Sequence, residues 1–449
     1  MKKFYKFMYV SVAVLSLSMA SCSDSDNDSD SSEFIDPTTV KDNYSYASER
    51  TGTSVFTDAD YSNVAFGNIA IENCTNLVSQ LEAANEAIGK ASLTEEQTAY
   101  LKEVLATLVD DVIVPTYTSL ADNTEKLETV LNGLTTETIT QAQISEACEY
   151  FANARSYWEL SEAFLGGAAS DFDIDPTIDS WPLSRTLLVN YLSSGTLNED
   201  MLDDASILGF HALEFVLFRN GQPRKVEELR GMDIYNGFEN ISGAVELTYA
   251  QQVCKLLKER AYQLQVAWEG PTMANAARLK AVQEAGLDYQ TAKKQSFGYN
   301  LKHAGESTST FATLKSAVAQ VLSDEEGSAA AIANEVGTAK IANPFANGVI
   351  SYVESPYSYR SIVDFQDNIR SVRNVWYGNV NGTRSSKIKS FYAFFLSVEN
   401  AANNATNKKV VDAFVNSINA IGGMPSPFVK YCSIITGKDF SEEEYTGED

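Results

Sequence analysis

Apolar residues recur at spacings of three and four along most of the chain, starting with Phe66, Ala70, Cys74, Leu77 and Leu81. This spacing places them on one face of an α-helix, which turns once every 3.6 residues. The same pattern predicts further helices over residues 94 to beyond 112, 138–165, 184–193, 198–219, 240–268, 272–297, 308–323, 328–341, 384–402 and 406–421, and an apolar helical face within 358–378. Strand-like alternation never persists for more than a few residues, so the sequence predicts an all-α fold.

A charged segment without helical periodicity, residues 221–238, interrupts the series of helices. The preceding helix ends in an Asn-Gly-Gln-Pro sequence, which is typical of a chain turn. We therefore expect two four-helix-bundle-like domains packed against each other, residues 51–230 and residues 231–449. The chain of 449 residues is long enough for two domains of ordinary size.

Residues 207–218 are apolar on every side of a helix except at His211 and Glu214. A helix that is apolar all round is buried inside a protein, so both polar side chains should lie inside. Their spacing of three residues points them toward a common volume, and Gly209 leaves that face open to close approach. A buried carboxylate must be paired, protonated or bound to a cation. His211 and Glu214 are therefore candidate metal ligands, and the alternative is a structural pair that binds nothing.

A second group of polar residues follows one helical stripe in residues 138–165. Arg155, Trp158 and Glu162 are spaced by three and four residues, which puts a cation, an indole and a carboxylate on one side. A core Trp beside a surface salt bridge is the plain alternative. The following loop carries Asp171, Asp173, Asp175 and Asp179, but it lacks the glycine and the closing glutamate of an EF-hand. We expect these four acids to be mostly solvated.

The N-terminus reads as an export signal. Lys2, Lys3 and Lys6 precede an apolar run over residues 7–17, and small residues lead to Cys22. We expect residues 1–21 to be a lipoprotein signal peptide, with lipid attached to Cys22, and residues 22–50 to be an acidic flexible tether. An ordinary cleaved leader with an incidental cysteine is the alternative. This interpretation predicts an exported lipoprotein of the outer membrane that faces the periplasm or the cell surface.

Charge and cysteine content narrow the function classes. The net charge of -26 argues against binding to nucleic acid or to an anionic membrane surface, and favours attraction to cations. The remaining cysteines are far apart without a C-x-x-C motif, and each falls on an apolar helical stripe: Cys74, Cys148, Cys254 and Cys432. We expect buried free thiols rather than disulfides.

The chain contains two histidines, His211 and His303, and this limits catalytic chemistry. The zincin motif H-E-x-x-H and its inverted form are absent, as are the ferritin-like Glu-x-x-His pairs and a phosphate-binding loop. A mixed histidine and carboxylate site suits iron, manganese or zinc.

Several motifs together resemble the imelysin family. Gly209-x-His211-x-x-Glu214 matches its Gly-x-His-x-x-Glu signature, and Trp181-Pro182 matches the Trp-Pro that closes its loop. Three further stretches are similar to the family pattern: Pro115-Thr116-Tyr117, the segment from Arg155 to Gly166, and the segment from Ser358 to Gly378. Together the matches span roughly residues 115 to 378.

The resemblance implies an all-helical, two-bundle periplasmic or surface protein with a site where the bundles meet. The family is associated with iron uptake and was first classed as metallopeptidases. By this resemblance His211 and Glu214 are core site residues. The residues that the resemblance implies as site lining are Arg155, Trp158, Glu162, Asp364 and Arg373.

Three hypotheses follow. The leading one is a lipid-anchored protein that binds a metal ion or an iron compound between the bundles and serves iron uptake with transporter components; the candidate ions are iron and zinc. The second is a zinc-dependent peptidase that uses His211 and Glu214, with His303 as an optional third ligand. The third is a surface scaffold or adhesin in which the His211–Glu214 pair is purely structural.

Overall fold

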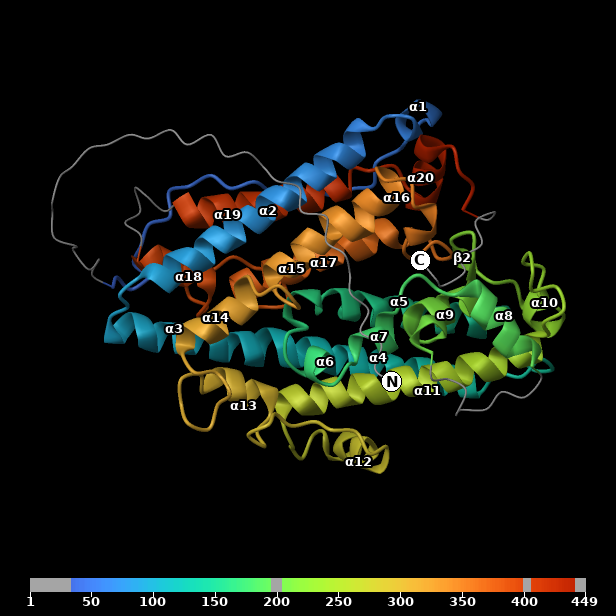
Figure 1. Cartoon of the computed structure of the whole chain (residues 1–449), viewed down its shortest axis with the longest axis horizontal. Helices are drawn as coiled ribbons and strands as arrows, with labels where there is room; N and C mark the ends of the chain where they lie inside the picture. The colour runs from blue at the N-terminus through green and yellow to red at the C-terminus, as the bar shows by residue number, and fades with distance from the viewer. Residues whose placement is uncertain (1–33, 195–203, 399–404, 441–449) are drawn as a thin grey trace, which may run out of the picture. The chain divides into compact units, whose positions relative to one another are not determined.

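Helices make up nearly all the regular structure of the computed structural model, which describes residues 34–194, 204–398 and 405–440 (Figure 1). The α-helices are α1 (Asp58–Tyr61), α2 (Ala65–Lys90), α3 (Glu95–Leu108), α4 (Val114–Asn132), α5 (Gln141–Glu159), α6 (Ala168–Asp171), α7 (Asp175–Asp179), α8 (Arg185–Ser193), α9 (Gly209–Leu217), α10 (Val226–Arg230), α11 (Gly243–Glu269), α12 (Ala276–Glu284), α13 (Phe297–Lys302), α14 (Leu314–Leu322), α15 (Ala329–Glu335), α16 (Asn343–Phe345), α17 (Ser361–Tyr377), α18 (Phe391–Val398), α19 (Ala405–Ile421) and α20 (Phe428–Thr436). Shorter 3₁₀ or π segments are η1 (Val109–Ile113), η2 (Glu162–Phe164), η4 (Ala205–Ile207), η5 (Val336–Ala342) and η6 (Ile350–Tyr352). In the described residues the strands are β1 (Phe218–Arg219) and β2 (Gln222–Pro223), an antiparallel pair with Phe218 opposite Pro223. The all-α prediction is confirmed.

The predicted apolar face of α2 is the face that packs. Ala70, Cys74, Leu77 and Leu81 are fully buried, and the helix lies against α19, α15 and η5. Figure 1 shows α2 and α19 side by side, so the first long helix and one of the last share a core. The periodicity fixed which face is buried, because only that face lacks groups that need water.

Helices α3 and α4 form one continuous helical rod joined by the π segment η1. Thr94 caps the start of α3 through the predicted capping box with Gln97. Pro115 lies at the start of α4, directly after η1. Proline has no N–H to donate, and the chain accommodates this with wider turns rather than a break. The rod, Glu95–Asn132, is long and apolar enough to span a membrane by length and composition alone, but the buried side chains of Leu101, Val104 and Leu108 place it in the core.

Two groups of packed helices carry the core of the described residues. Helix α11 packs on α4 and α9, and α4 packs on α5; α2 packs on α19 and α15, and α17 packs on α19 and α15. The two groups meet where α17 contacts α5 and η2. Each group draws helices from both sides of residue 230, and the division into domains 51–230 and 231–449 stays a prediction.

Some element boundaries differ from the sequence prediction. The predicted helix 272–297 is wrong: α12 ends at Glu284, and Gly286 then adopts a φ of +67°, a left-handed conformation that stops a helix. Residues 198–203 of the predicted helix 198–219 lie outside the described residues; in the described part, the segment η4 precedes α9, which begins at Gly209, whose φ is +72°.

The segment before α1 is held to the protein along part of its length. The predicted signal peptide, Cys22 and the first part of the predicted tether lie outside the described residues. Residues 34–50 of that tether instead lie along α18 and α19: the amide of Ala47 donates to Asp412 Oδ1 at 2.8 Å, and that of Arg50 donates to Asn419 Oδ1 at 2.7 Å. This part of the tether prediction is corrected, because the acidic composition of residues 23–33 does not extend over it. The four cysteines within the described residues are buried free thiols, as predicted.

Candidate metal centre at helix α9

The signature glycine brings a second element against α9. A Cβ atom on Gly209 would lie 2.0 Å from the carbonyl oxygen of Ile178, near the end of α7. The positive φ of Gly209 and its missing side chain therefore let α7 approach α9 closely. This approach places Asp179, the last residue of α7, next to His211.

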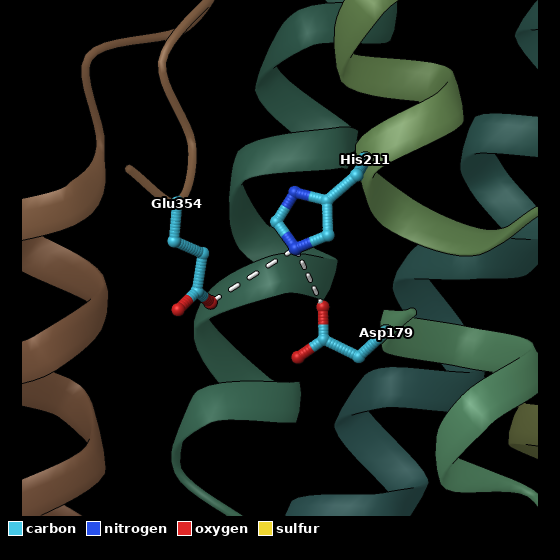
Figure 2. A group of neighbouring side chains, drawn as sticks. All are labelled: Asp179, His211 and Glu354. Atoms are coloured by element: carbon cyan, nitrogen blue, oxygen red, sulfur yellow. Dashed lines mark ion pairs between the residues drawn. The ribbon is translucent and has the colours of Figure 1, made fainter. Parts of the chain in front are cut away.

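His211 is the centre of the site. Its side chain is 1% exposed, and its Nε2 atom lies 3.0 Å from Asp179 Oδ1 and 3.9 Å from Glu354 Oε1 (Figure 2). Burial and the Arg155 guanidinium disfavour a charged imidazole, but the adjacent Asp179 and Glu214 carboxylates outweigh them and raise the pKa of His211. The Nε2 atom of His211 therefore faces two carboxylates, which favour a positive charge next to it.

Glu214 supports the site from behind. Its Oε2 atom lies 3.4 Å from His211 Nδ1, and its Oε1 atom accepts hydrogen bonds from the amides of Tyr357 and Ser358 and from the Ser358 hydroxyl, at 2.7–2.9 Å. Three donors thus satisfy Oε1, and Oε2 faces the imidazole. Glu214 thus links α9 to the segment before α17 and orients His211, in the manner of a carboxylate behind a ligating histidine.

Asp179 is held by two side chains of α5. The indole of Trp158 donates to Asp179 Oδ2 at 2.7 Å, and the guanidinium of Arg155 pairs with Asp179 Oδ1. Burial opposes ionisation of Asp179, but the charge of Arg155 and the adjacent His211 hold the pKa of Asp179 well below its usual range. Asp179 therefore stays a carboxylate.

Glu354 belongs to the helix group that contains α17, not to the group that contains His211. It precedes α17, its side chain is 4% exposed, and both of its oxygens accept hydrogen bonds from Lys340 Nζ, at 3.2 and 3.0 Å. Arg155 also pairs with Glu354 and lies 3.5 Å from Asp364 on α17. Asp364 accepts a hydrogen bond from Ser355 at 2.6 Å. Glu159 on α5 also pairs with Arg155. Carboxylates from α5, α7, the segment before α17 and α17 itself thus converge on one guanidinium.

Donor atoms of this cluster fit a cation in number, type and spacing. One oxygen of Asp179, one of Glu354 and one nitrogen of His211 all lie within 4.8 Å of one another. Nitrogen and oxygen ligands at this spacing are typical of iron, manganese or zinc sites. His211 Nε2 is buried and lies 3.0 Å from Asp179 Oδ1, but it is not in hydrogen-bond geometry with that atom or with any other described residue. A buried polar atom needs a well-placed partner, and an ion bound beside Asp179 and Glu354 would supply one to this nitrogen.

The predicted site residues separate into two sets. His211, Glu214, Arg155, Trp158 and Asp364 come together, as described above. Glu162 is buried on η2 beside them, where burial raises its pKa well above its usual range. Arg373 lies nine residues after Asp364 on α17, about 13 Å along the helix axis, and it pairs with Glu49 instead. His303, the third ligand of the peptidase hypothesis, follows α13, pairs with Glu306 at 3.0 Å and stacks on Tyr299.

Sequence reasoning missed Asp179, Glu159, Lys340 and Glu354 as parts of the site. Asp171 and Asp173 are exposed as expected of the loop acids, but the expectation of mostly solvated acids was wrong for Asp179, whose side chain is 5% exposed. The position of Asp179 two residues before Trp181 was the available signal. Glu354 and Lys340 have no local signal, because only the packing of distant segments brings them to His211.

Residues 353–360, between η6 and α17, form a wall that faces the cluster on one side and a groove on the other. Glu354, Ser355 and Ser358 contact the cluster, whereas Tyr357 and Tyr359 line an open groove of about 820 Å³. Ser355 and Tyr359 have positive φ values of 52° and 60°, which are uncommon for residues with side chains. Residues of this segment thus face opposite sides because its backbone is locally strained.

A sequence model of the imelysin family matches residues 113–442, close to three quarters of the chain. The chain belongs to the imelysin family. Iron-regulated protein A of Synechococcus elongatus is 30% identical over 129 residues, which are 29% of this chain and 35% of that protein. The chain therefore matches about a third of the length of that relative.

One solved structure shows the same fold. The crystal structure of a putative iron-regulated protein A precursor from Parabacteroides distasonis aligns with a TM-score of 0.55 and 23% identity, over 78% of this chain and 96% of that one. An imelysin-like protein from Psychrobacter arcticum aligns with a TM-score of 0.41 and 12% identity, over 76% and 97% of the two chains. The first of these places this imelysin-family chain among helical folds of the same kind.

Replacing the signature glycine should separate α7 from α9. Gly209→Ala puts a methyl group onto the Ile178 carbonyl and a side chain at positive φ, so we expect the free energy of unfolding to fall by at least about 1–3 kcal/mol. Urea unfolding followed by circular dichroism measures this. Gly89→Ala is the control, because a Cβ there meets nothing within 4 Å and should cost no stability. Equal stability of both variants would show that the close approach is not required.

The stability of the fold should depend on pH through Asp175. Burial and then the nearby Asp179 carboxylate raise its pKa to about 7, from an ordinary value of 3.8. A raised pKa of an acid means that the folded state loses stability as the pH rises from about 4 through 7. Asp175→Asn removes this loss, so its stability relative to the wild type should increase between pH 5 and pH 8. Asp173→Asn, at an exposed position, should show the same difference at both pH values; thermal unfolding at each pH checks both.

Proposed function

We propose that this imelysin-family protein binds a divalent metal ion, with iron as the first candidate, through Asp179, His211 and Glu354. The observation that carries the proposal is that three donor atoms from three separate segments converge, and that His211 Nε2 lacks a partner in hydrogen-bond geometry among the described residues. The burial of all three side chains would exclude water from part of the coordination sphere. Glu214 would fix the ring orientation of His211 rather than ligate the ion.

The ligands suit iron among other ions, and the name of a relative points to iron. One imidazole nitrogen and two carboxylate oxygens form a mixed set that suits borderline and harder ions better than soft ones. The name of iron-regulated protein A supports the same choice, although it describes that protein. The strongly acidic chain would also concentrate cations near its surface.

Binding is favoured over peptide hydrolysis for a structural reason. The peptidase hypothesis needs a free carboxylate to accept a proton from water, and it gives this role to Glu214. One oxygen of Glu214 accepts three hydrogen bonds and the other faces His211. We therefore favour capture and delivery of a metal ion over peptide hydrolysis as the function.

Metal titration of the full chain tests the proposal. The wild type should bind one ferrous ion per chain in anaerobic calorimetry, and His211→Ala should lose at least about 100-fold in affinity, because it removes a ligand. His303→Ala is the matched control and should bind like the wild type, since that histidine lies beside Glu306. If His211→Ala binds as the wild type does, the site assignment is wrong and the pair is structural, as the scaffold hypothesis holds.

We further propose that the protein acts at the outer membrane, held by a lipid on Cys22, and passes its ion to transporter components during iron uptake. The basis is the sequence alone: a basic start, an apolar run and small residues before a cysteine. A lipid anchor would keep a soluble binding domain close to its partner in the envelope.

Fractionation of expressing cells tests the anchor. We expect the wild type in the membrane fraction and Cys22→Ser in the soluble fraction, because the substituted residue has no thiol to acylate. Ser23→Ala keeps the cysteine and should remain with the membrane. Membrane retention of Cys22→Ser equal to that of the wild type would contradict lipid attachment at this residue.

A further inference from the structure

Lys340 carries a buried positive charge into the candidate metal centre. It lies in the π segment η5, its side chain is 8% exposed, and its Nζ atom donates to both oxygens of Glu354. π segments frequently occur at functional sites, because the wider turn redirects side chains. Lys340 thus reaches the cluster from the helix group that does not contain His211.

The atom that Lys340 contacts is also the atom available to a metal ion. Glu354 Oε1 lies 3.2 Å from Lys340 Nζ and 3.9 Å from His211 Nε2, and Arg155 pairs with the same oxygen. Figure 2 shows this carboxylate turned toward the imidazole. An ion bound between Glu354 and His211 would therefore face two positive charges at close range. Like charges within a buried site repel strongly, so both cations cannot keep their present contacts beside the ion.

A second partner for Lys340 is already within reach. Glu335, at the end of α15, has an oxygen 3.6 Å from Lys340 Nζ, and its side chain is 51% exposed. The carboxyl groups of Glu159 and Glu162 also interact electrostatically with Lys340. The ammonium group can thus leave Glu354 and remain paired, whereas Arg155 is held by carboxylates on four segments.

We propose that Lys340 is a resident counter-ion that competes with the metal ion for Glu354. Without the ion, Lys340 neutralises Glu354 and keeps it in place. When the ion binds, the ammonium group moves toward Glu335 and away from the ligand oxygen. This inference rests on the proposed function, and it makes Lys340 a positioning residue that lowers metal affinity and makes release easier, as a protein that delivers its ion requires.

Calorimetric titration of full-chain variants with ferrous ion alone tests the competition. Lys340→Met removes the charge and keeps much of the chain length, so it should bind the ion about tenfold more tightly or better. Lys340→Arg keeps the charge and should bind within a few fold of the wild type. Lys302→Met is the matched control at a lysine paired with Asp110, and should bind like the wild type.

Thermal unfolding provides a readout that does not depend on affinity alone. Lys340→Met should unfold at a lower temperature than the wild type without metal, because Glu354 loses a partner. Saturating ferrous ion should raise its melting temperature by more than it raises that of the wild type, because the ion replaces the lost charge. A variant that packs poorly for other reasons would be destabilised equally with and without the ion.

Glu335→Gln tests where the ammonium group goes. If Glu335 receives Lys340 in the loaded state, this variant should bind ferrous ion more weakly than the wild type, but it should change nothing in the Lys340→Met background. A general loss of negative charge would weaken binding in both backgrounds by the same factor, and this result would overturn the proposed movement.

The outcomes separate this inference from the proposed function. If the wild type and Lys340→Met both fail to bind ferrous ion, both proposals are overturned. If the wild type binds through His211 and a folded Lys340→Met binds equally or more weakly, the metal site stands and the competition by Lys340 is wrong.

Discussion

The buried guanidinium of Arg155 is the contact on which the arrangement of the site depends. It meets Glu159 on its own helix, Asp179 on α7, Glu354 before α17 and Asp364 on α17. Burying a charge costs several kcal/mol unless partners surround it, so these segments can pack around Arg155 only if each supplies a carboxylate. The electrostatic requirement of one side chain thus fixes the relative positions of elements from both helix groups.

The same requirement makes the centre suitable for a cation. Carboxylates outnumber permanent cations around His211, and burial removes the water that would otherwise screen them. Burial also raises the pKa of Glu159 and of Glu162 well above their usual range, so the cluster resists full ionisation in the absence of more positive charge. Glu214 and the wall before α17 then hold the imidazole so that one nitrogen faces this negative region.

Gly209 of the family signature lets α7 come close to α9, and this is its role rather than backbone flexibility in general. Without a Cβ, Gly209 lets the Ile178 carbonyl lie against the start of α9. The consequence for function is indirect, since the approach delivers Asp179 to His211. The His and Glu of the signature likewise differ in role, because one faces the cluster and the other anchors the wall.

The sequence by itself determined the all-α fold, the buried faces of α2 and α9, the reduced cysteines and the family. These features follow from local periodicity and from a short signature, which each segment carries without reference to the rest. The sequence also brought forward residues that meet at the centre, His211, Glu214, Arg155, Trp158 and Asp364, with Glu162 beside them, whereas Arg373 pairs with Glu49 farther along α17. Tertiary structure alone decided that the Asp179 and Glu354 carboxylates lie next to His211 Nε2 and that Lys340 pairs with Glu354. Glu354 lies 143 residues after His211 in the chain, and no local pattern encodes a contact that only the packing of two helix groups creates.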